Sequence, residues 1–343
     1  MALFEKRAFG LDIADHTIEV VEMKKSFFSP RPVVAARQRM PLENGIVDSG
    51  RVVNRKMLAE AITLLWNALG STPASVVFGL PERQVYTSLI TIPASSPSAE
   101  MIADMAAKTI PIERDDLSLA SVVIARTRES TDLLVYGASR EYINEWRDFF
   151  ESIDIAVLAF DHELLAIERG LFGRAAHDPC CVIDIGAERT KIAIFSNGAL
   201  MYVAALDIAG DAYTREIAKA LDLPLDAAEK MKREQGMQPA NLYALFTKLL
   251  APMVAEISAA VSYADDALHT KIPRAVLVGG SSQMKGLPEY LAEQLHLPVE
   301  LGRPFLFSGE QNAGLLYLHY IEAIGLALRG VEPQWETLHP PLR

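Results

Sequence analysis

Cysteine is nearly absent from this sequence of 343 residues, and so is any concentration of positive charge. The only cysteines, Cys180 and Cys181, are adjacent and cannot join distant segments by an ordinary disulfide, so we expect reduced thiols in a buried strand. The 33 Lys and Arg residues are outnumbered by 44 Asp and Glu residues, which gives a net charge of −11. Without a basic run to neutralise phosphates, nucleic-acid binding is not expected.

Long apolar stretches are also missing. No run approaches the roughly 18 apolar residues typical of a membrane span, and the N-terminal stretch MALFEKR lacks the apolar segment of a signal peptide. We therefore expect a cytoplasmic protein. Half of the residues are hydrophobic and 22% are charged, which is typical of a globular protein with a large core and, at this length, two domains.

One stretch in the middle of the chain has the pattern of a phosphate-binding hairpin. Two apolar strands, Cys181–Ile185 and Thr190–Phe195, flank a short polar turn. Gly186 in the turn allows backbone angles at which several N–H groups point into one concavity that holds phosphate. Asp184 beside it can hold Mg²⁺ through water, and Thr190 can donate a hydroxyl to a phosphate oxygen. Taken alone, the stretch fits a plain hairpin with a glycine turn as well as it fits a phosphate site.

A second copy of this pattern stands near the N-terminus. Residues 9–23 align with it on Asp12 and Asp184, since both copies read apolar, apolar, Asp, Ile, small, then a polar turn, Thr and an apolar strand. A repeat at this distance predicts two related halves that grip a polyphosphate from both sides. A third piece, residues 274–286, is a buried strand that runs into Gly279 and Gly280, where the backbone can approach a flat ligand closely.

Three such pieces in this order resemble the actin, Hsp70 and sugar-kinase superfamily, and the closer resemblance is to the PilM family of type IV pilus assembly, which is related to FtsA. The PilM resemblance extends over residues 9–330. It is also carried by four further stretches: 77–82 (VFGLPE), 109–117 (TIPIERDDL), 160–170 and 323–330 (AIGLALRG).

The resemblance implies an α/β, duplicated actin-like (ribonuclease H-like) fold with a small inserted α+β subdomain. The implied boundaries are 1–82 and 154–176 for the first domain, 83–153 for the insert, 177–209 and 271–330 for the second domain, and 210–270 for a helical adenosine-side subdomain. Simple continuation of the first domain is the alternative for residues 83–153. Residues 331–343 are proline-rich, and we expect them to be disordered.

The resemblance also implies ATP or ADP bound with Mg²⁺, and it assigns residues to each part of the ligand. The expected phosphate contacts are Asp12, Ala14, Asp15, Thr17, Asp184, Gly186, Ala187, Thr190 and Gly210, with Mg²⁺ held by Asp12 and Asp184 through water. The expected adenosine contacts are Glu229, Lys232, Gly279, Gly280, Ser281 and Ser282, although a solvated helix face is an equal alternative for Lys232.

The turn residues depart from the family pattern. Ala14 stands where the family has glycine, and Asp15 adds negative charge near the phosphates. Glu188 and Arg189 replace small or hydroxyl residues in the second turn. Since neither hairpin offers an obvious base to activate water, we expect slow hydrolysis or none.

The resemblance favours a nucleotide-binding scaffold that binds the N-terminal tail of a PilN-like inner-membrane protein. Membrane association would come only through partners, and self-association stays open. The tail would dock between the first domain and the insert, at strand Gln84–Ile92 and at Met101, Ile102 and Met105, although these three side chains have the alternative of filling the insert's own core. Two other functions are kept as alternatives: a small-molecule kinase of the superfamily, which needs a general base, and an FtsA-like division protein, which needs a basic amphipathic helix at its C-terminus.

Overall fold

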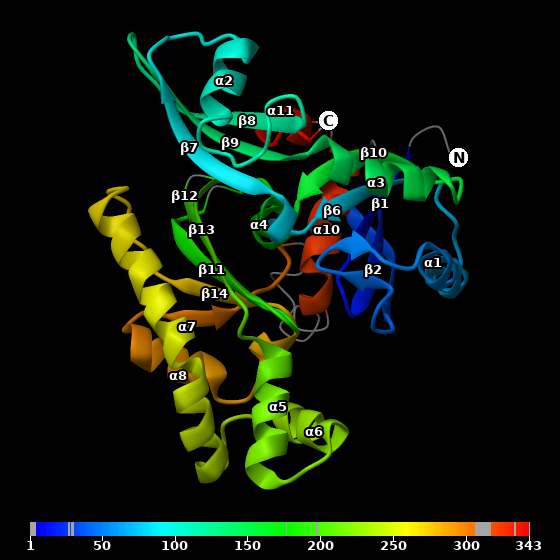
Figure 1. The fold of residues 1–343 in the computed structure, drawn as a ribbon, viewed down its shortest axis with the longest axis vertical. Helices are drawn as coiled ribbons and strands as arrows, with labels where there is room; N and C mark the ends of the chain where they lie inside the picture. The colour runs from blue at the N-terminus through cyan, green and yellow to red at the C-terminus, as the bar shows by residue number, and fades with distance from the viewer. Residues whose placement is uncertain are drawn as a thin grey trace. The chain divides into compact units, whose positions relative to one another are not determined.

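The computed structural model describes residues 5–26, 28, 31–175, 177–196, 198–305, 317–332 and 334–342. The chain forms two compact units. Unit 1 combines Met1–Arg174 with Tyr320–Arg343, and unit 2 is the continuous segment Ala175–His319 (Figure 1). The sequence-based boundaries placed residues 320–330 in the second domain, whereas the structure places them in unit 1.

Each unit contains a five-stranded sheet of the same design. Unit 1 has strand order β10-β6-β1-β2-β3 and unit 2 has β15-β14-β11-β12-β13; in both, the first three strands in sequence are antiparallel and the remaining two are parallel to the first. The predicted repeat is therefore confirmed. The strands are β1 (Glu5–Ile13), β2 (Thr17–Ser26), β3 (Val33–Pro41), β6 (Ser75–Leu80), β10 (Ala156–His162), β11 (Cys180–Ile185), β12 (Thr190–Ser196), β13 (Ala199–Leu206), β14 (Ala275–Val278) and β15 (Val299–Leu301).

Helices cover both faces of the unit 1 sheet because its strands carry apolar residues on both sides. Helices α1 (Arg55–Leu69) and α3 (Arg140–Glu151) cover one face, where the Phe78 ring packs against Trp146 with 4.5 Å between ring centroids. The other face carries α4 (Glu163–Phe172) and α10 (Ile321–Val331), and Figure 1 shows α10 beside β1 and β6.

The contact of α10 with α4 is unusually close. A Cβ added at Gly325 would lie 1.8 Å from the Ala166 carbonyl oxygen, and one added at Gly170 would lie 2.1 Å from the Ile321 carbonyl oxygen. On the opposite side of α10, a Cβ at Gly10 of β1 would lie 2.1 Å from the Ala323 carbonyl oxygen. Only glycine lets these backbones approach so closely.

Between β6 and β10 the chain inserts a separate three-stranded sheet. Its strands β7 (Tyr86–Ile92), β8 (Leu117–Arg126) and β9 (Thr131–Ser139) have the order β7-β9-β8, and α2 (Ala99–Ala106) packs on it over a small apolar core of its own. The predicted insert included α3 as well. In the structure α3 packs on the main sheet of unit 1, because its Trp146 and Phe150 rings pack against Phe78 and its Arg147 guanidinium lies over the Phe160 ring.

Helices of unit 2 bury one face of its sheet. They are α5 (Gly210–Leu221), α6 (Leu225–Gln235), α7 (Ala240–Asp266) and α8 (Leu287–Leu295). By length and composition alone α7 could cross a membrane, and it is the one described helix of which this is true; seven of its residues, from Leu242 to Ala264, are buried, and these form part of the core of unit 2. Cys180 and Cys181 are buried, unpaired thiols in β11, as predicted.

The C-terminal segment differs from its prediction. Residues 334–342 are packed on unit 1: α11 (Trp335–Leu338) is followed by Leu342, which forms a β-bridge with Phe160. The Tyr136 hydroxyl of β9 donates to the Pro340 carbonyl, and the Arg169 guanidinium lies 5.0 Å from the centre of the Trp335 ring. The prolines of this segment predicted disorder. In the structure, contacts with residues distant in sequence hold residues 334–342 in place.

Candidate functional site

The first hairpin of the predicted phosphate site lies in unit 1, between β1 and β2. Asp12 stands one residue before the end of β1, paired in register with Glu19. The Ala14 amide donates to the Thr17 carbonyl at 2.9 Å, which closes the turn, and the Thr17 hydroxyl donates to Glu19 Oε2 at 3.3 Å. The turn is therefore well ordered without glycine at position 14.

Asp15 has a different role from the predicted one. Its carboxylate accepts the backbone amides of Ser49 and Gly50, each at 3.1 Å. Both residues have positive φ, 53° and 74°, so the loop is a tight turn whose N–H groups point at one anion. The sequence placed Asp15 among the phosphate contacts, but its two oxygens instead hold the 49–50 loop.

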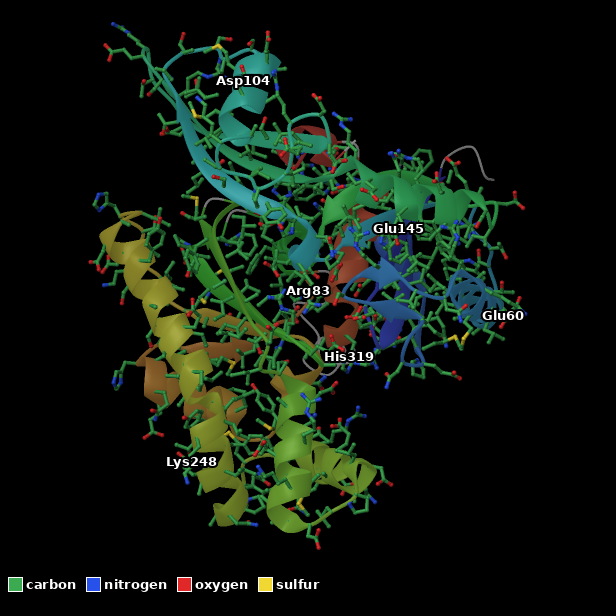
Figure 2. The ribbon with its side chains drawn as sticks, viewed as in Figure 1. Glu60, Arg83, Asp104, Glu145, Lys248 and His319 are labelled. Atoms are coloured by element: carbon green, nitrogen blue, oxygen red, sulfur yellow. The ribbon has the colours of Figure 1, made fainter. Side chains whose placement is uncertain are left out.

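This loop also connects the first hairpin with the insert and α3. The Gly50 carbonyl accepts the Tyr142 hydroxyl at 2.7 Å and Trp146 Nε1 at 3.1 Å, and the Ser49 carbonyl accepts Gln84 Nε2 at 3.0 Å. Figure 2 labels two neighbouring side chains, Arg83 and Glu145, which hydrogen-bond to Ser49 Oγ and to the Val52 amide respectively. A continuous set of hydrogen bonds thus joins Asp15 to both ends of the insert.

In unit 2 the second hairpin carries Asp184 at the end of β11. The Asp184 carboxylate forms an ion pair with Lys191, its direct cross-strand partner on β12, with 2.8 Å between Oδ2 and Nζ. The Gly186 amide donates to the Arg189 carbonyl at 3.0 Å and closes the turn. The Thr190 side chain is fully buried and its hydroxyl donates to the Ile208 carbonyl at 2.7 Å, so this hydroxyl supports the strand rather than pointing out of the turn.

Two other segments of unit 2 converge on this turn. The Gly186 carbonyl accepts the Gly210 amide at 3.1 Å and the Ser281 hydroxyl at 3.0 Å, and the Ala187 carbonyl accepts the Asp211 amide at 2.8 Å. The N-terminus of α5 and the 3₁₀ turn Gly280–Gln283 are thereby fastened to the hairpin. The Gly210 amide, predicted to contact phosphate, is already used in this network.

Gly279 lies directly against the hairpin. Its φ is 83°, and an added Cβ would lie 2.4 Å from Asp184 Oδ1 and 2.5 Å from the Ile185 carbonyl oxygen. The Ser282 hydroxyl donates to the Gly279 carbonyl at 2.7 Å and is buried inside the turn. The predicted adenosine turn therefore adjoins the predicted phosphate hairpin, with Ser282 supporting the turn from within.

Glu229 and Lys232 of α6 also reach this region. Lys232 is only 6% exposed and its ammonium donates to the Gly210 carbonyl at 2.8 Å, so the alternative of a solvated side chain does not apply. Glu229 accepts the Lys232 ammonium at 2.6 Å and the Thr214 hydroxyl at 2.5 Å. Partial burial alone would raise the pKa of Glu229, but these hydrogen bonds lower it to about 2.

The donor set at Asp184 does not fit the predicted Mg²⁺ site. Mg²⁺ takes oxygen ligands and water in a near-octahedral shell, whereas one Asp184 oxygen carries the Lys191 ammonium and the other lies against Gly279. Sequence reasoning missed Lys191. The alternating pattern of β12 could have identified it, since Lys191 interrupts an apolar strand opposite Asp184.

The three residues predicted for a partner groove lie on α2. Ile102 and Met105 pack against the insert's own core, and Met101 is 40% exposed. The opposite face of β9 carries Tyr136, which contacts the C-terminal segment of unit 1. Ile102 and Met105 therefore take the alternative role of core residues, and α2 covers the face of the insert sheet opposite to Tyr136.

Comparison with known proteins places this site in a wider context. The sequence profile of the family described as "Type IV pilus assembly protein PilM" matches residues 10–331. The cell division protein FtsA of Pseudomonas aeruginosa is 30% identical over 178 residues, which make up 45% of this chain and 42% of that protein. The chain thus spans less than half of this curated relative.

Solved structures share the fold over almost the whole chain. A chain of the PilM–PilN type IV pilus biogenesis complex has a TM-score of 0.82 at 24% identity and covers 95% of this chain and 99% of its own length. MreB5 of Spiroplasma citri, solved with AMPPNP, has a TM-score of 0.57 at 10% identity and covers 94% of this chain and 96% of its own. The predicted duplicated actin-like fold is confirmed.

Proposed function

Because the chain belongs to the type IV pilus assembly protein PilM family, we propose that it is an actin-like scaffold that binds ATP or ADP and holds the N-terminal tail of a PilN-like inner-membrane protein. It would act at the cytoplasmic side of the inner membrane through that partner. The family match extends across nearly the whole chain, so it favours this function over the kinase and division-protein alternatives.

The observation that carries nucleotide binding is the convergence within unit 2. The Gly186 turn, the α5 N-terminus and the Gly279–Gly280 turn are joined by direct hydrogen bonds. Gly280 is exposed, and a Cβ added there would meet no atom closer than 3.5 Å, so a ligand can approach its backbone closely. A helix N-terminus such as that of α5 favours an anion. Actin-like MreB5 was solved with AMPPNP, which supports a nucleotide as the ligand. We expect hydrolysis of bound ATP to be slow or absent.

Gly279→Ala is expected to abolish nucleotide binding, because the new methyl group would push Asp184 out of the hairpin. The measurement is the rise in melting temperature on adding ATP or ADP; a ligand at 100 times its dissociation constant stabilises the native state by about 2.7 kcal/mol. Gly45→Ala is the matched control, since Gly45 has the same φ of 83° with nothing within 4 Å of its added Cβ.

A normal nucleotide-induced rise in Gly279→Ala would place the ligand elsewhere. If wild-type protein shows no rise at millimolar nucleotide, the proposed nucleotide binding itself is wrong.

For the partner tail we propose the outer edge of β7. Among the described residues β7 pairs with β9 on one side only, and it exposes Tyr86 and Leu89, which are 43% and 39% exposed. An extended apolar peptide can add to such an edge by backbone hydrogen bonds. Tyr86 and Leu89 are three residues apart and face opposite sides of β7, so side chains on both faces of the peptide would find an apolar contact. The PilM–PilN complex supports a PilN-like tail as the occupant.

Leu89→Lys is expected to weaken binding of a synthetic PilN-like N-terminal peptide at least tenfold, because it removes apolar contact and adds charge to the edge strand. Fluorescence polarisation measures the affinity. Leu64→Lys on α1 is the control, since Leu64 is also exposed, at 57%, but lies away from the insert. Equal affinity of both variants and the wild type would exclude the β7 edge.

A further inference from the structure

The Asp184–Lys191 pair is the least expected feature of the unit 2 site. The two residues face each other across β11 and β12, and their side chains are only 11% and 16% exposed. Their neighbours along the strands, Ile183, Ile185 and Ile192, belong to the apolar core of unit 2. Since successive strand side chains alternate between faces, the pair lies on the face opposite to that core.

Both sides of the Asp184 carboxylate are occupied. Its Oδ2 lies 2.8 Å from the Lys191 ammonium, and its Oδ1 lies so close to Gly279 that a Cβ there would come within 2.4 Å. A hydrated Mg²⁺ needs a near-ideal shell of oxygen atoms and would sit beside a fixed positive charge. Lys191 therefore disfavours Mg²⁺ binding at Asp184 in two ways: its ammonium occupies the carboxylate, and its positive charge repels the metal ion.

Lysine can take over the electrostatic role of such a metal. An ammonium carries three N–H donors, so it can donate to a carboxylate and to a phosphate oxygen at the same time. Lysine binds phosphate as a point charge, without the strict geometry of a metal shell. In the hairpin, the Asp184 carboxylate holds this charge next to the Gly186 turn, where the second phosphate contact is expected.

We propose that Lys191 supplies the cation at the phosphate end of the unit 2 site, so that nucleotide binding does not require a divalent metal. The proposal rests on the nucleotide binding proposed above. It replaces the sequence-based prediction that Asp184 holds Mg²⁺, and it makes Asp184 the residue that positions Lys191.

The test is the affinity for fluorescently labelled ADP, measured by polarisation once in excess EDTA and once in excess Mg²⁺. Wild-type protein is expected to give dissociation constants within about twofold of each other in the two buffers. Lys191→Met is expected to weaken binding in EDTA at least tenfold. Lys191→Arg, which keeps the charge, should retain metal-independent binding, and so should Lys248→Met, a control on the exposed side of α7 that Figure 2 labels.

Different failures have different meanings. If wild-type protein binds ADP at least tenfold more weakly in EDTA than in Mg²⁺, the metal is required and the inference is overturned while nucleotide binding stands. If binding is metal-independent but unchanged in Lys191→Met, another group supplies the charge and the inference is equally overturned. If wild-type protein binds in neither buffer, the proposed nucleotide binding is wrong, and the inference falls with it. The comparison of wild-type affinity in the two buffers does not depend on the folding of any variant.

Discussion

Asp161→Ala is expected to destabilise unit 1 by about 3–5 kcal/mol, which is the usual cost of leaving buried charges without their partner. The Asp161 side chain is fully buried and accepts hydrogen bonds from two buried arginines. Arg169 donates to Oδ2 at 2.7 Å, and Arg329 donates to Oδ2 at 2.7 Å and to Oδ1 at 2.9 Å. Without the carboxylate, both guanidinium groups would remain in the interior.

Denaturant unfolding at pH 7 measures this effect, and Glu60→Ala is the control. Glu60, labelled in Figure 2, pairs with Lys56 on the surface of α1, where the side chains are 64% and 87% exposed. A surface pair of this kind contributes at most about 0.5 kcal/mol. A loss below about 1 kcal/mol in Asp161→Ala would contradict the argument.

The difference between wild type and Asp161→Asn is also expected to depend on pH. Burial alone would raise the pKa of Asp161, but attraction and hydrogen bonds from Arg169 and Arg329 hold it well below the ordinary 3.8. A depressed pKa means that the stabilisation is complete above 3.8 and is lost as pH falls toward the folded value. The difference in unfolding free energy should therefore be constant from pH 7 to 5 and shrink below pH 3.8.

Gly325→Ala is expected to destabilise unit 1 by more than about 3 kcal/mol. Helix propensity alone would make this change stabilising by up to about 1 kcal/mol, because alanine is the better helix former. The added methyl group, however, would lie 1.8 Å from the Ala166 carbonyl oxygen, so α4 and α10 would have to separate. Overpacking of a tight core typically costs 1–3 kcal/mol, and here the obstacle is rigid backbone.

The double variant Gly170→Ala with Gly325→Ala sharpens the test. Both glycines lie at the same helix crossing, so once the helices separate for one methyl group the second fits more easily. The combined loss of unfolding free energy should be clearly smaller than the sum of the two single losses. If Gly325→Ala instead stabilises the protein, α4 and α10 can move apart more easily than the distances at their crossing indicate.

Local patterns were sufficient to predict much of the fold. Both predicted hairpins form within residues 9–23 and 181–195. Helix α1 begins after Asn54, whose side chain accepts the Met57 amide, and ends before Gly70 at φ 73°, which agrees with the usual preference for these residues at helix ends. These features depend on neighbours in sequence, so the sequence alone contains the required information.

Long-range partners account for the differences. The carboxylate of Asp15 is fixed by amides 34 and 35 residues away, and the packing of residues 334–342 depends on Arg169 and Arg329. The sequence shows Lys191 as a charged residue in an apolar strand, but its pairing with Asp184 depends on the strand register, which only the structure gives. In unit 2 the predicted segments lie against one another, but which of their hydrogen-bond donors are used within the protein depends on contacts between these segments.

The division of unit 1 across both ends of the chain has a consequence for protein synthesis. Gly10 in β1 receives its packing partner Ala323 only after some 300 further residues have been made, which takes roughly 15–60 s at bacterial translation rates. Unit 2 is one continuous segment, and its last strand β15 ends at Leu301, before α10 begins at Ile321, so its sheet is complete in the nascent chain before that of unit 1 is covered. Until then, one face of the unit 1 sheet is covered by α4 but not by α10, and such exposed apolar surfaces attract chaperones. We therefore expect the N-terminal half of the protein to be the later one to reach its native state.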